Sequence, residues 1–167
     1  MKTKGSTLFE AEPGKQEVRI TREFDAPREL LFRALTEGKY YEQWIGPRRL
    51  QTKIEILDAR SGGRYRYVQD DGAGHQHAFH GVYHEVTFPE RIIDTFEYEG
   101  LPEKGHVFLE TTKLEELPEG RCRLVTQAVY QSVSDRDGMV HAGMEHGVIE
   151  SHARLAELLE KLQSAGT

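Results

Sequence analysis

The residues best suited to bind a metal are histidines, and four of the eight in the chain cluster in one segment at His75, His77, His80 and His84. Side chains alternate between the two faces of an extended strand, so His77 points away from His80 and His84. No cluster of Cys or Asp adjoins them to complete a ligand set. The sequence therefore predicts no metal site, and no cofactor.

Nucleophilic and acid–base catalysis have few candidates. Cys122 is the only cysteine and lies in a strand pattern, which favours a buried structural role and permits no disulfide within the chain. Glu85 and His152 could act as general acid and base, which keeps a cyclase-like or hydrolase-like enzyme open as an alternative. An ion-paired Glu and a helix-surface His explain the same residues more simply. We therefore expect a binding protein rather than an enzyme.

Aromatic side chains are the richer signal. Tyr65 and Tyr67 fall on one face of a predicted strand, and Phe79 and Tyr83 fall on one face of the next strand. Trp44 lies in a short helical segment. Such rings either fill a core or line an apolar pocket.

The C-terminal helical pattern adds material for the opposite wall of such a pocket. Gly143 and Gly147 each cost roughly 1 kcal/mol relative to Ala inside a helix, so they indicate close packing or space beside it. Met139 and Met144 supply adaptable apolar surface. The predicted ligand-binding residues are Trp44, Tyr65, Tyr67, Phe79, Tyr83, Met139, Met144, Val148 and His152.

Regular patterns predict the elements that position these residues. Alternating polar and apolar residues from Val18 to Phe24 indicate a first strand. A helix begins near Asp25, a candidate N-cap, and Gly38 separates it from a second helical piece that ends before Gly46. Six further strands follow at Leu50–Leu57, Arg64–Gln69, Gln76–Val86, Ile92–Tyr98, Val107–Leu114 and Cys122–Tyr130.

Short Gly-, Pro- and Asp-containing turns separate these strands, which favours an antiparallel meander. After Ser134 the apolar residues recur every three to four positions, which predicts one long amphipathic helix to about Gln163. The helix and the sheet each need cover for an apolar face, so they should pack together as an α+β domain.

Length and composition limit the classes of function. The chain has 167 residues, a net charge of −6 and no apolar run of the roughly 20 residues that a membrane helix requires. Its basic residues are scattered, so we expect neither a membrane nor a nucleic-acid partner. Residues 1–15 lack the apolar core of a secretory signal, and a cytoplasmic location is expected. The expected organisation is a flexible arm at 1–17, a single domain at 18–163 and a tail at 164–167.

From about Ile20 to Leu159 the chain resembles the stand-alone proteins similar to the C-terminal domain of the heat-shock protein 90 ATPase activator, in the START-related (Bet v-like) SRPBCC superfamily. The matching segments are Arg22-x-Phe24-x-Ala26-Pro27, Trp44-Ile45-Gly46-Pro47, Gly62-Gly63-Arg64-Tyr65, Gly81-x-Tyr83-x-Glu85-Val86 and Pro89-Glu90-Arg91. The resemblance implies a helix-grip fold, in which about seven antiparallel strands and two short helices wrap the C-terminal helix.

Members of this superfamily carry ligands, cyclise aromatic substrates or regulate chaperones, so the fold leaves several functions open. Our first hypothesis is the binding of a small hydrophobic or aromatic molecule between the sheet and the C-terminal helix. The alternatives are a regulator of a heat-shock protein 90 homologue, with a part in the stress response, and an enzyme that uses the same cavity. The sequence leaves a monomer and a homodimer equally open.

Overall fold

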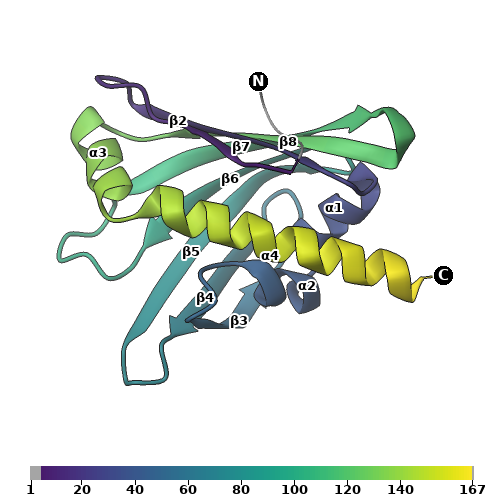
Figure 1. The fold of residues 1–167 in the computed structure, drawn as a ribbon. Helices are drawn as coiled ribbons and strands as arrows, with labels where there is room; N and C mark the ends of the chain where they lie inside the picture. The colour runs from purple at the N-terminus through teal and green to yellow at the C-terminus, as the bar shows by residue number, and fades with distance from the viewer. Residues whose placement is uncertain (1–4, 167) are drawn as a thin grey trace.

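The computed structural model describes residues 5–166, which form an α+β fold with a curved antiparallel sheet around a long C-terminal helix (Figure 1). This confirms the expected helix-grip architecture. The strands are β1 (Leu8–Glu10), β2 (Glu17–Phe24), β3 (Gln51–Leu57), β4 (Arg64–Asp70), β5 (Gln76–Thr87), β6 (Arg91–Tyr98), β7 (Val107–Leu117) and β8 (Arg121–Val129). The helices are α1 (Arg28–Thr36), α2 (Gly38–Trp44), α3 (Val133–His141) and α4 (Met144–Ala165), with a 3-10 turn at Pro118–Gly120.

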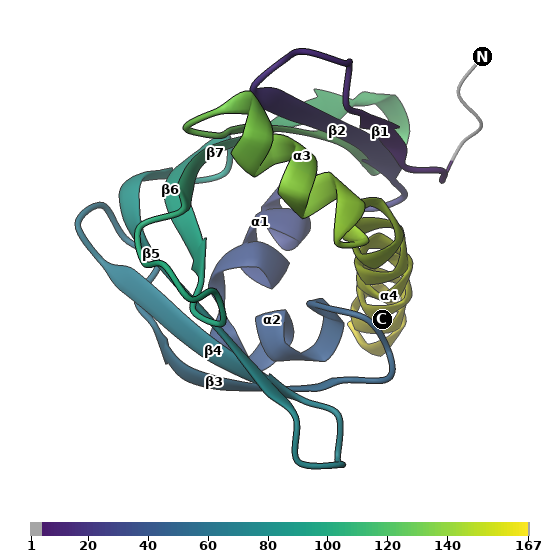
Figure 2. The ribbon, with the colours of Figure 1, turned by 90° about the vertical axis from the view of Figure 1, so that its left-hand side faces the viewer.

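The sheet has the order β1-β2-β8-β7-β6-β5-β4-β3, and every neighbouring pair is antiparallel. Strands β3 to β8 therefore form the expected meander. The N-terminal strand β2 joins its far side, with Val18 opposite Ala128 and Phe24 opposite Cys122. Viewed along the interior, the strands curve around one side, α4 closes the other, and α1 and α2 lie at the far end (Figure 2).

The sheet has eight strands rather than about seven, because Leu8–Glu10 adds the edge strand β1. Its three residues are too few for an alternating pattern to stand out in the sequence. Phe9 lies opposite Ile20 of β2, so the strand depends on pairing with a partner. The expected arm and tail also include Met1–Lys4 and Thr167, which lie outside the described residues.

The start of α1 differs from the expectation. The N-cap is Pro27, which makes no side-chain hydrogen bond, and the helix begins at Arg28. Asp25 does not cap it; its carboxylate instead accepts a hydrogen bond from Arg121 Nε at 2.7 Å. The Asp25 side chain, which the sequence suggested as an N-cap, thus forms a charge-assisted hydrogen bond with β8 instead.

The C-terminal segment is two helices rather than one. Gly143 adopts φ 95°, a left-handed conformation, and separates α3 from α4. Ser132 begins α3 by accepting a hydrogen bond from the Asp135 backbone N–H at 3.0 Å. The apolar periodicity continues across the break, so periodicity alone could not reveal it.

Contacts with the loop after α2 hold α4 in place across the sheet. The Gly46 N–H donates to Ser151 Oγ at 2.9 Å, and Arg154 donates to the Gly46 carbonyl at 2.9 Å. Leu155 and Leu159 of α4 are almost fully buried in the main apolar core. The position of α4 is therefore set by both polar and apolar contacts. No helix within residues 5–166 is long and apolar enough to cross a membrane.

Candidate functional site

A chain of aromatic contacts runs from α2 onto the concave face of the sheet. The ring centroids of Trp44 and Tyr41 lie 5.2 Å apart, and those of Tyr41 and Tyr67 lie 5.6 Å apart. Tyr67 of β4 then stacks on Phe79 of β5 at 5.1 Å. Offset and edge-on ring pairs at these distances are favourable packing arrangements. Trp44, Tyr67 and Phe79, all predicted from the sequence, thus belong to one aromatic surface.

Tyr65 and Tyr83 widen this surface. The Tyr65 ring lies 6.2 Å from Tyr67 and 5.4 Å from Tyr83, and all three are buried. The Tyr65 hydroxyl donates to the Thr95 carbonyl at 2.5 Å. The predicted aromatic residues therefore lie together, as their alternation on β4 and β5 requires.

The chain of rings continues through residues that the sequence analysis did not select. Phe79 lies 5.3 Å from Phe96 of β6, Phe96 stacks on Phe108 of β7 at 4.9 Å, and Phe108 lies 4.5 Å from Tyr130. The Tyr130 hydroxyl donates to Met144 Sδ at 3.3 Å. The aromatic surface thus spans the sheet from α2 to the start of α4.

The C-terminal residues of the predicted set lie on α3 and α4, beside the sheet. Met139, Met144 and Val148 are half-buried and pack against a buried cluster that includes Phe108 and Tyr130. A Cβ placed at Gly147 would meet no atom within 4 Å, so close packing does not explain that glycine. The space next to Gly147 is open instead.

His152 is the outlying member of the predicted set. Its Nδ1 lies 3.1 Å from Thr7 Oγ1, its ring meets the edge of Phe24 at 5.9 Å, and Arg22 donates to the same Thr7 hydroxyl. Burial, and then the positive charge of Arg22, lower the pKa of His152 to about 4. At neutral pH this imidazole is uncharged.

Two carboxyl groups on the concave face escaped the sequence analysis. Asp94 of β6 is paired in register with Glu110 of β7. Asp94 alternates with Ile92 and Phe96, which pack in the core, and Glu110 follows buried Phe108 by two residues. Both carboxyls therefore share the inner face of the sheet. The sequence signal that could have identified them is a charged residue that falls on the same strand face as its apolar neighbours.

The surroundings of this pair favour its protonated form. Burial raises the pKa of Glu110 to about 7. Burial, and then the charge of Glu110, hold the pKa of Asp94 well above its usual range, while the Tyr65 hydroxyl acts in the opposite direction. Two carboxyls that share a site of low polarity cannot both ionise cheaply. At neutral pH the pair retains protons that exposed carboxyls would have lost.

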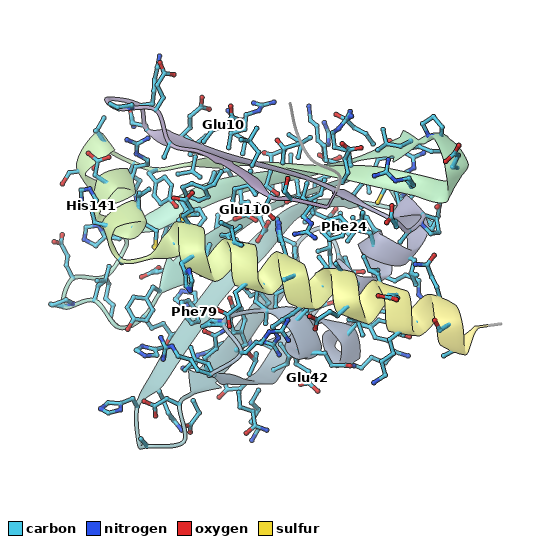
Figure 3. The ribbon with its side chains drawn as sticks, in the orientation of Figure 1. Glu10, Phe24, Glu42, Phe79, Glu110 and His141 are labelled. Carbon is cyan, nitrogen blue, oxygen red and sulfur yellow. The ribbon has the colours of Figure 1, made fainter. Side chains whose placement is uncertain are left out.

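The inner face is not completely covered around this pair. Asp94, Glu110, Phe79 and Phe96 point inward, yet each remains half-buried, in contrast to buried Tyr67 beside them. Figure 3 labels Glu110 at the upper side of α4 and Phe79 below the helix. Part of the concave face therefore remains within reach of solvent.

Two hollows lie elsewhere, and neither contains a predicted site residue. The larger, about 640 Å³, lies between the end of β2 and the second half of α4, and the other, about 430 Å³, lies near the β5–β6 turn. Four acidic residues line the larger hollow: Glu23, Asp25, Glu157 and Glu160. An apolar ligand would desolvate these charges, so this hollow suits it poorly.

The structure does not bring the suggested acid–base pair together. Glu85 accepts a hydrogen bond from Arg91 at 2.7 Å, which lowers the pKa of its carboxyl, whereas His152 contacts Thr7 and Phe24. Cys122 is buried, and burial raises its pKa to about 12. Within residues 5–166, no group of three or more His, Cys, Asp or Glu could hold a metal ion.

Comparisons with known proteins agree with the fold. A family model described as activator of Hsp90 ATPase homolog 1-like protein matches residues 25–160. A protein from Rhodobacter sphaeroides is similar in structure with a TM-score of 0.81 at 24% identity, over 93% of this chain and 99% of that one. A protein from Chromobacterium violaceum gives 0.71 at 27% identity, over 86% and 97%.

A solution structure from Arthrobacter aurescens gives a TM-score of 0.83 at 21% identity, over 92% of this chain and 91% of that one. At this identity the likeness concerns the fold alone. None of the curated proteins compared matches the sequence.

Proposed function

Because the chain belongs to the family of activator of Hsp90 ATPase homolog 1-like proteins, whose fold is compatible with ligand binding, we propose that it binds a small hydrophobic or aromatic molecule between the sheet and α4. The observation that carries the proposal is the partial exposure of Phe79 and Phe96 on the concave face. Inward-facing rings that remain accessible offer apolar surface that a ligand can cover.

Burial of apolar surface supplies the affinity. Each Å² removed from water contributes roughly 25 cal/mol, so a ligand with one or two rings gains several kcal/mol by contact with this wall. Met144, which contacts Tyr130, can adjust its shape to different ligands. The nearby hydroxyl and carboxyl groups would orient the polar end of the molecule.

The test is titration of a neutral, solvent-sensitive naphthalene dye, 6-propionyl-2-(dimethylamino)naphthalene. We expect the wild-type protein to bind it with a blue-shifted emission. Met144→Glu should weaken binding at least tenfold, because the new carboxylate would be desolvated beside the ligand. Val82→Glu places the same charge on an exposed position of β5 and should bind like the parent. Equal affinity of the Met144→Glu protein and the parent would remove the proposal.

A second candidate function rests on the outer face of the sheet. Leu109 of β7 and Val129 of β8 are opposite each other and are 46% and 41% exposed. An exposed apolar pair could contact another protein, and the family's name makes an Hsp90 homologue the partner to try. The ATPase rate of that chaperone would be measured with the parent and with the Leu109→Ser/Val129→Ser protein. A rate that neither protein changes would exclude this candidate.

A further inference from the structure

We propose that Asp94 and Glu110 select a ligand that carries a protonated amine on its apolar or aromatic body. The inference rests on the proposed function and specifies the chemical class of the ligand. The occupant would place its ammonium group between the two carboxyls and its apolar part against the neighbouring rings.

The register brings the two carboxyls together. Asp94 and Glu110 are direct cross-strand partners, and such partners have Cβ atoms about 4.5–5.5 Å apart. Their side chains leave the same face of the sheet. A single ammonium group can therefore donate hydrogen bonds to both.

Neither carboxyl is neutralised by a cation within residues 5–166. The ion pairs of the described residues place every participating Arg, Lys and His beside other carboxylates, and no described side chain donates an N–H to Glu110. Burial is nevertheless sufficient, without a charged neighbour, to raise the pKa of Glu110 to about 7. A half-buried acid on the concave face without a cationic partner is an arrangement that a positively charged ligand completes.

The surrounding rings suit the same ligand. Burial is the main cause that raises the pKa values of Tyr65 and Tyr83, and the negative charge of nearby Asp94 is the second. Tyr67 and Phe79 extend the aromatic surface from there. The faces of aromatic rings attract cations, so rings and carboxyls favour the same charge on the ligand. An anionic ligand would be repelled by both.

The phenols around the pair and the imidazole of His152 do not change charge near neutral pH. Burial lowers the pKa of the His152 imidazole. Burial raises the pKa values of the neighbouring phenols, which belong to Tyr41, Tyr65, Tyr67, Tyr83 and Tyr130. The charged groups on neighbouring elements have partners of their own. Arg22 of β2 donates to Thr7, and Arg136 of α3 donates to Asp137 and to two carbonyls. On β5, His77 hydrogen-bonds to Tyr98. Binding of an ammonium ion should therefore displace protons from the carboxyl pair.

The experiment is isothermal titration calorimetry at pH 7.5 with three probes of similar shape: 1-naphthylmethylamine, which is cationic, neutral 1-naphthylmethanol and anionic 1-naphthoate. We expect the amine to bind at least roughly tenfold more tightly than the alcohol, and the anion to bind most weakly. Titration of the amine in two buffers with different ionisation enthalpies should reveal proton release.

The matched variants are Glu110→Gln, Asp94→Asn and Glu42→Gln. The first two should bind amine and alcohol with affinities within about twofold, and either one suffices if the other does not fold. Glu42 is exposed on α2 and lies away from the interior (Figure 3), so its variant should keep the preference for the amine.

If the alcohol binds but the amine has no advantage, or if its advantage survives both interior substitutions, the inference is wrong and the proposed function stands. If none of the three probes binds, both are wrong.

Discussion

Asp94 and Glu110 lie directly across from each other on β6 and β7, on the inner face of the sheet. Two carboxyls in this position cost stability when both are ionised, since burial and mutual repulsion act in the same direction. The pair is therefore more than a wall of the candidate site. It also makes the stability of the protein depend on pH.

Glu110→Gln should change that dependence. The folded-state pKa of Glu110 is raised to about 7 from the ordinary 4.5, so its contribution is complete below pH 4.5 and is lost as the pH rises through 7. Relative to the parent, the variant should gain on the order of 1–3 kcal/mol between pH 5 and pH 8. Urea unfolding at both pH values measures the gain. Glu42→Gln, at an exposed position, is the control. If the stability of Glu110→Gln relative to the parent were the same at pH 5 and pH 8, Glu110 would titrate like an exposed acid.

His152 should titrate far below an ordinary imidazole. Its pKa is lowered to about 4 by burial and by Arg22, so the stability that it contributes is present above pH 6.5 and is lost as the pH falls through 4. NMR titration of the imidazole Hε1 signals, assigned with His152→Gln, measures the value. Arg22→Gln should move it upward. A midpoint near 6.5 in the parent would contradict the buried, uncharged state.

Gly46→Ala should cost more stability than Gly62→Ala. Both glycines have positive φ, 86° and 87°, so each substitution carries the same backbone strain of about 1–2 kcal/mol. Only at Gly46 would the new Cβ meet an obstacle, 2.1 Å from Nε2 of buried Gln69. We expect an additional loss of roughly 1–2 kcal/mol there. Chemical unfolding of the two variants compares them directly, and equal losses would mean that Gln69 moves aside freely.

Cys122 should resist thiol reagents in the folded protein. It is buried on β8, and burial raises its pKa to about 12, so almost no thiolate forms at pH 8. Reaction with 5,5′-dithiobis(2-nitrobenzoic acid) should be slow in buffer and complete in urea. Rapid labelling without denaturant would show that β2 and β8 open readily at this position.

The strand pattern was readable from local chemistry. The period-two alternation from Leu50 to Tyr130 predicted β3 to β8 with ends that differ by no more than three residues, because alternation reflects a choice that each residue makes between core and solvent. The same alternation grouped four of the predicted aromatic residues, Tyr65, Tyr67, Phe79 and Tyr83. It could also have revealed Asp94 and Glu110, which occupy inward positions of their strands.

Other features depend on partners far away in the chain. Asp25 could cap a helix or pair with an arginine, and only the position of Arg121 on β8 decides for the ion pair. The strand β1 exists through its pairing with β2, and the break at Gly143 interrupts a periodicity that runs through it.

The sequence by itself determined the type and order of the main elements, since hydrophobic periodicity and turn residues act over a few neighbouring positions. Only the tertiary structure decided that Asp94 meets Glu110, that Tyr130 meets Met144 and that His152 lies beside Arg22 rather than in the aromatic wall. These contacts depend on strand register and on the placement of α4, which arise from the packing of the whole chain and leave no trace within a single segment.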